Sequence, residues 1–151
     1  MTPHSALIAI GWAVLAPLAC QAPQSVDESP SAALLQTCAP WDGPAVSLFL
    51  TDSPGASTYP APPYRAITIY RDLNEVLGER FEVTATTPQV GIAQDCASAG
   101  RCTSVLGAAV QFGGLGADST ILVTYRFERA PGGVQSGIVK ARLYPQARMC
   151  G

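Results

Sequence analysis

The feature that most constrains this chain is a strict two-residue alternation between residues 120 and 129. The apolar positions of this alternation are Ile121, Val123, Tyr125 and Phe127. Side chains of a β-strand point alternately to the two faces of a sheet, so this pattern predicts a strand with one buried face. Turn residues, Ala130-Pro131-Gly132-Gly133, follow directly, and they predict a hairpin with a returning strand.

Shorter alternating segments recur after residue 38, separated by turn residues. They predict strands over Pro44–Thr51, Arg65–Asp72, Arg80–Thr86, Thr103–Phe112 and Val134–Tyr144. The further positions expected to face the core are Val46, Leu48, Leu50, Ile67, Ile69, Phe81, Val83, Ala85, Leu106, Ala108, Val110, Phe112, Val139, Ala141 and Leu143. The 13 prolines and 14 glycines favour many turns, and a helical turn is expected at residues 73–78. The sequence therefore predicts an all-β fold, a single antiparallel β-sandwich or barrel-like domain.

The N-terminus carries an uncharged apolar run, Ala6–Ala16. This run is too short for a bilayer-spanning helix, which needs about 20 residues, and it matches the hydrophobic region of a signal peptide. Pro17 and the small residue Ala19 follow, as expected near a cleavage site. The pattern predicts a signal peptide over residues 1–19 and export of the protein. The alternative is a buried core helix.

Residues Leu18-Ala19-Cys20 resemble the end of a bacterial lipobox, the motif of secreted lipoproteins. The match is partial, because lipoboxes usually carry leucine at the position of Pro17 and a small residue at the position of Leu18. The resemblance implies that Cys20 becomes the acylated N-terminus and anchors the protein in a membrane. Gln21 in place of aspartate implies the outer membrane. The alternative is cleavage after Ala19 or Ala22 by the ordinary signal peptidase, which gives a soluble periplasmic or secreted protein. The chain resembles no named domain family.

The chain has five cysteines, and an odd number in an exported protein leaves one thiol to explain. Acylation of Cys20 accounts for that thiol and leaves enough cysteines for two disulfides. Three pairings are possible, and we expect Cys96–Cys102 across a short loop and Cys38–Cys150 between the ends of the domain. A zinc site is the alternative, although C-x5-C without histidine does not match zinc spacing. Residues 20–37 are then a lipidated N-terminus and flexible tether, and residues 38–151 a disulfide-braced β domain.

Catalytic groups are scarce in this sequence. The one histidine, His4, lies in the predicted signal peptide, so Ser-His-Asp and Cys-His catalysis and histidine-ligated metal sites are not expected. We expect no cofactor and no metal ion. The net charge of −2, with no basic run, argues against nucleic acid as a partner. Carboxylates could pair at about 5–10 Å in an envelope hydrolase, but none has a distinctive context. We therefore expect a protein that is not an enzyme.

Four residues are candidates for a binding surface: Trp41, Tyr59, Tyr64 and Arg101. The two tyrosines lie in or beside a proline-rich loop, and exposed aromatic rings can hold carbohydrate or peptide ligands. Arg101 lies on the loop that the Cys96–Cys102 disulfide would brace, which lowers the entropy lost on binding. The structural alternative is that Trp41 packs over the other disulfide and the tyrosines cover the sheet edge.

These observations predict a non-catalytic lipoprotein of the cell envelope. Its membrane contact is expected through the lipid on Cys20, and its β module is expected to be structural or to bind an unknown ligand or envelope partner. Two alternatives remain: an envelope hydrolase with paired carboxylates, and a freely secreted binding or inhibitor protein.

Overall fold

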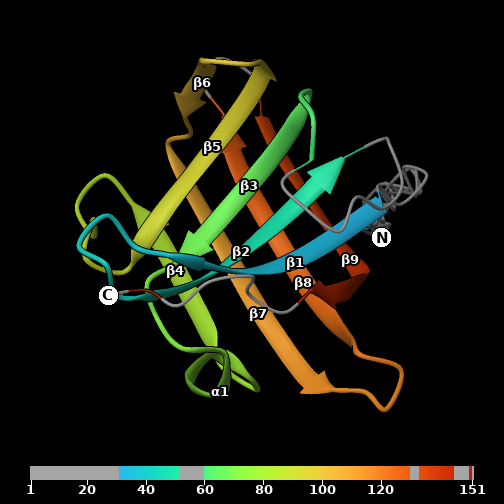
Figure 1. The fold of residues 1–151 in the computed structure, drawn as a ribbon. Coiled ribbons are helices and arrows are strands. Elements are labelled where there is room, and N and C mark those ends of the chain that lie inside the picture. The colour runs from blue at the N-terminus through green and yellow to red at the C-terminus, as the bar shows by residue number, and fades with distance from the viewer. Residues whose placement is uncertain (1–30, 52–59, 130–132, 145–149, 151) are drawn as a thin grey trace, which may run out of the picture.

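The computed structural model describes residues 31–51, 60–129, 133–144 and 150 of the chain. They form one nine-stranded sheet that curls into a half-barrel (Figure 1). The elements are β1 (Ser31–Cys38), β2 (Pro44–Thr51), β3 (Tyr64–Ile69), α1 (Leu73–Val76), β4 (Arg80–Thr84), β5 (Gly91–Ser98), β6 (Arg101–Ser104), β7 (Gly107–Leu115), β8 (Thr120–Arg129) and β9 (Gly133–Tyr144). The predicted all-β, barrel-like class is confirmed.

The strand order is β4-β7-β8-β9-β1-β2-β3-β5-β6. Every neighbouring pair is antiparallel except β1 and β9, which run parallel through the pairs Ala33–Arg142, Leu34–Leu143 and Leu35–Tyr144. The expectation of a purely antiparallel sheet is therefore wrong at this pair. β1 and β9 are the first and last strands along the chain, so no hairpin turn joins them. Antiparallel pairing, which a hairpin would impose, is therefore not required of them.

The core lies inside the curl of the sheet. Inward side chains from every strand except β6 form one cluster, in which Phe112, Phe127, Leu34 and Leu48 are fully buried. β3 and β4 lie in opposite halves of the sheet. The chain passes from one to the other through α1, at one end of the half-barrel (Figure 1). Val76 of α1 is completely buried in the core there. Burial of this apolar surface is the main favourable term in the free energy of folding.

The helix α1 begins with a capping box. The side chain of Asp72 accepts a hydrogen bond from the Asn74 backbone N–H at 3.0 Å, and the Glu75 carboxylate accepts one from the Asp72 backbone N–H at 3.2 Å. Both bonds satisfy backbone donors that a helix start leaves unpaired. The helical turn predicted at residues 73–78 is therefore present as α1.

Strand β1 corrects the predicted domain boundary. The sequence predicts a tether through residue 37, but the chain is a strand from Ser31 onwards. Ala33, Leu34 and Leu35 are all buried, because β1 lies in the middle of the sheet and both of its faces are covered. A strand covered on both faces has no polar alternation to reveal it. Residues 20–30, Cys20 and the predicted signal peptide lie outside the described residues.

The predicted strand Thr103–Phe112 is in fact two strands. β6 ends at Ser104 and β7 begins at Gly107, so the chain leaves one edge of the sheet and re-enters near the other. Leu106 was expected in the core, but it lies in this crossing and is 61% exposed. Ala85 was also expected in the core, but it follows the end of β4 and is exposed. The other predicted inward positions belong to the core cluster or pack against it.

Candidate binding site

The outward face of β3 forms the floor of a shallow trough of about 170 Å³. Strand alternation places Tyr64, Ala66, Thr68 and Tyr70 on this face. The side chains of Ala66 and Thr68 are small and leave room for the trough. The two tyrosines lie towards its opposite ends. The trough is lined by Thr37, Cys38, Pro40, Ser47, Phe49, Tyr64, Ala66, Thr68, Tyr70, Ile92 and Gln94.

Three hydroxyl groups form a continuous row across this face, one from each of β1, β2 and β3. The Thr37 and Ser47 oxygens are 3.0 Å apart, and the Ser47 and Thr68 oxygens are 2.7 Å apart. Thr37 and Ser47 are buried, and Thr68 is half-buried. Three hydroxyls carry three protons, and the two contacts use two of them. One hydroxyl proton of the row therefore remains for another acceptor, and all three residues of the row line the trough.

Aromatic rings flank the hydroxyl row. Tyr64 packs edge-to-face against Phe49 with ring centroids 5.2 Å apart, and Tyr70 packs edge-to-face against Trp41 at 4.6 Å. Such pairs fix ring orientation and add to burial. Burial raises the pKa of the Tyr70 phenol above its usual value near 10, so the group stays a neutral hydroxyl at physiological pH. The trough thus has rigid, uncharged aromatic ends.

Among the residues that the structure describes, no charged side chain lines the trough. Gln94 supplies an amide on the β5 side, and this amide has no hydrogen-bond partner among the described residues. An amide offers two donors and an acceptor. The trough therefore presents hydroxyl and amide groups between apolar walls, which suits a neutral ligand that both donates and accepts hydrogen bonds.

Two disulfides brace the domain, and both predicted pairings are present. Cys38 is bonded to Cys150, with Cα atoms 5.6 Å apart, and Cys96 to Cys102. Cys38 lines the trough, so the first bond holds the end of β1 beside the binding face. Cys96 and Cys102 face each other directly across β5 and β6. The second bond therefore closes a hairpin at the edge of the sheet.

One of the four residues predicted for a binding surface, Tyr64, lines the trough. Trp41 does not line it but packs against the lining residue Tyr70, and it is 60% exposed. Arg101 is exposed on the β5–β6 hairpin and does not line the trough, and Tyr59 lies outside the described residues. Prediction from sequence missed Thr37, Ser47, Thr68, Tyr70 and Gln94. Their one signal in the sequence is a polar residue or tyrosine at an outward strand position.

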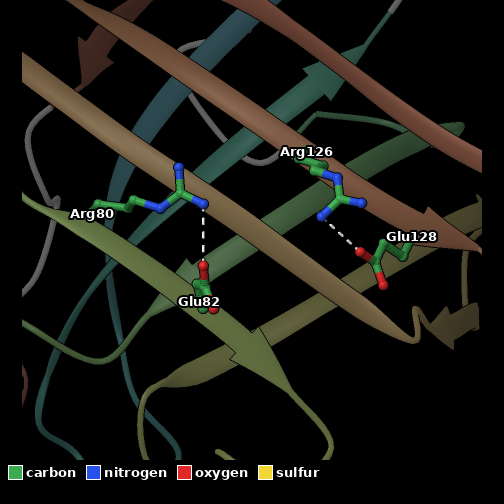
Figure 2. A network of polar contacts seen from close by, with 4 residues as sticks. All are labelled: Arg80, Glu82, Arg126 and Glu128. Atoms are coloured by element: carbon green, nitrogen blue, oxygen red, sulfur yellow. Dashed lines mark hydrogen bonds and ion pairs between the residues drawn. The ribbon is translucent and has the colours of Figure 1, made fainter.

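Carboxylates gather on another part of the surface. Glu82 of β4 and Glu128 of β8 line a small hollow of about 80 Å³, with Gly107 and Ala109 of β7 between them. Figure 2 shows each carboxylate paired with an arginine of its own strand, Arg80–Glu82 at 3.1 Å and Arg126–Glu128 at 2.8 Å. The four side chains are 43–69% exposed, so both pairs lie in solvent. The hollow therefore has the character of two exposed surface ion pairs.

In the described segments, no three His, Cys, Asp or Glu residues are grouped closely enough to hold a metal ion. Among those segments, no helix has the length and apolar character needed to cross a bilayer.

Comparison of the chain with protein-family models, with curated proteins and with solved structures gives no match.

Proposed function

We propose that this chain is a non-catalytic, lipid-anchored protein of the cell envelope, and that its β domain binds a neutral carbohydrate in the trough on β3. The observation that carries the ligand class is the row Thr37–Ser47–Thr68 between two tyrosine rings, in a lining whose described residues are all uncharged. Sugars present hydroxyl groups around their rim and an apolar face, and these match the polar floor and the aromatic ends.

Cysteine pairing supports the lipid anchor. Cys38, Cys96, Cys102 and Cys150 are bonded in two disulfides, which leaves Cys20 as the fifth cysteine of the chain. The lipobox-like residues before Cys20 provide for its acylation, and Gln21 favours the outer membrane. Disulfides of this kind persist in an oxidising compartment outside the cytoplasm.

The anchor is tested by the intact mass of the protein purified without reduction from expressing bacteria. We expect a start at Cys20, an added diacylglycerol, and a loss of about four hydrogens for the two disulfides. An unmodified chain that starts near the same residue and is recovered from the medium would instead identify a freely secreted binding protein.

The ligand class is tested by titrating the purified protein with glucose, galactose, mannose and N-acetylglucosamine. Binding is followed by calorimetry and by the fluorescence of Trp41, which contacts a tyrosine of the trough. We expect at least one sugar to bind saturably. The proposal is wrong if none of these sugars binds, or if an anionic sugar binds and the neutral ones do not.

Two variants locate the binding. Thr68→Val keeps the shape of the side chain and removes its hydroxyl, and Gln94→Leu removes the amide. Each should weaken binding about tenfold, because a ligand group left without its partner costs about 1–3 kcal/mol. Thr124→Val makes the same change on the outward face of β8 and should leave binding unchanged. Equal affinities for the T68V and T124V variants would exclude the trough as the site.

A further inference from the structure

The outward face of β8 and β9 exposes aliphatic side chains to an unusual degree. Leu122 is 58%, Ile138 57% and Val134 56% exposed. Leu122 pairs in register with Lys140, and Ile138 with Thr124, so Leu122 and Ile138 are diagonal neighbours on the same face. Their apolar surfaces are therefore presented together, and we call this surface the β8–β9 face.

Cationic side chains lie among these aliphatic residues. Arg126 of β8 and Lys140 and Arg142 of β9 occupy outward positions on the same two strands. Arg126 and Lys140 form ion pairs with Glu128 at 2.8 Å and with Asp118 at 2.7 Å, and the guanidinium of Arg142 lies 5.7 Å from the Tyr144 ring centroid. The surface therefore carries three cations against two carboxylates. A surface with interspersed aliphatic and basic groups is the type that rests in the headgroup region of a bilayer.

The start of β1 lies beside this face. The parallel register pairs Ala33 with Arg142, which puts Ser31 at the level of Lys140 on the neighbouring strand. Cys20 lies eleven positions before Ser31, a length that spans at most about 40 Å when fully extended. A lipid on Cys20 therefore keeps the β8–β9 face within reach of the membrane.

We propose that the β8–β9 face docks on the phospholipid surface to which Cys20 anchors the protein. This inference rests on the proposed lipid anchor. The aliphatic residues enter the headgroup region, and the cations contact lipid phosphates. The trough is lined by residues of β1, β2, β3 and β5, so the β8–β9 face and the trough use different strands of the sheet.

The chain provides a specific probe for this face, because Lys140 is its one lysine. The purified acylated protein is placed in vesicles of phosphatidylethanolamine and phosphatidylglycerol, and separately in detergent micelles. A membrane-impermeant amine-reactive ester is added, and labelling of the Lys140 peptide is followed by mass spectrometry. The variant R101K supplies an internal reference amine on β6, which four strands separate from β9.

Docking predicts that Lys140 labelling, relative to the reference amine, slows about fivefold or more in vesicles compared with micelles. L122E/I138E should remove this protection, and Gln111→Glu on the outward face of β7 should keep it. Acylated protein whose Lys140 and reference amine label alike in vesicles overturns the docking alone. Protein without the lipid overturns the anchor and the docking together. Protection that also occurs in micelles and grows with protein concentration identifies a second copy as the occupant, which overturns docking on lipid.

Discussion

Removing the Cys38–Cys150 disulfide tests how the domain is held together. The two residues are 112 positions apart and their Cα atoms are 5.6 Å apart, a separation usual for disulfides. The bond therefore closes nearly the whole domain into a covalent loop without forcing the backbone. The chain-entropy relation gives about 4.8 kcal/mol for a loop of this length at 25 °C, and removal of native disulfides typically costs about 2–5 kcal/mol. We expect C38A/C150A to lose about 3–5 kcal/mol of unfolding free energy.

The assay is urea unfolding followed both by circular dichroism and by Trp41 fluorescence. With a slope of about 1–3 kcal/mol per molar urea, the midpoint should fall by about 2 M. The matched control is C96A/C102A, whose bond spans six positions and is worth about 2.2 kcal/mol by the same relation. C96A/C102A also loses packing at the buried Cys96, which reduces the difference in unfolding free energy between the two double variants. It should not reverse that difference. A cost below about 1 kcal/mol for C38A/C150A, or a larger cost for the hairpin pair, would refute the loop-closure reasoning.

Three further changes probe the core, the sheet and a surface ion pair. Phe127→Ala should lower the free energy of unfolding in urea by about 3–5 kcal/mol, because its ring is fully buried. Thr124→Ala on the exposed face should change that free energy by no more than about 0.5 kcal/mol. Similar costs for the two variants would mean that the strand faces are assigned the wrong way round. Gly91→Ala should lower the melting temperature clearly, because a Cβ there would clash with the backbone oxygen of Thr68, and an unchanged melt would contradict that close approach. Hydrogen bonds from Lys140 and from Thr120 lower the pKa of Asp118 from 3.8 to about 2. The contribution of Asp118 to stability is therefore present above about pH 4 and is lost as the pH falls towards 2. The stability difference between wild type and D118N should therefore shrink over that range, and a pH-independent difference would contradict the assignment.

The strand β8, which has one exposed face, was predictable from the sequence, and residues 120–129 form it over the full predicted range. Residues 44–51 also form the predicted strand β2, although this strand is buried on both faces. In β8 the alternation of side chains matches one buried and one solvent-exposed face, so the two-residue period is visible. The strand β1 was not predicted, because its Ala-Ala-Leu-Leu run resembles a helix former as much as a strand.

The candidate site could be predicted only in part, because it depends on register between distant strands. Thr37, Ser47 and Thr68 are unremarkable single residues in the sequence, and they meet only because β1, β2 and β3 pair in one specific register. Local sequence carries the alternation of a strand but little information on which strand lies beside it. Tyr64 was found because an aromatic ring beside prolines is a local signal. The disulfides were found because cysteine parity and spacing can be read directly.

The position of Cys150 against the end of β1 determines how the domain responds to mechanical force. Tension that enters at Ser31 runs along β1 to Cys38 and passes through the disulfide directly to Cys150. All the other strands, β2 to β9, lie inside the covalent loop that this bond closes. A pull between the two ends therefore loads β1 alone, in shear against β2 and β9, and the trough strand β3 carries no tension. With the disulfide reduced, the same pull would be transmitted through Tyr144 into β9 and would draw the sheet apart from its last strand.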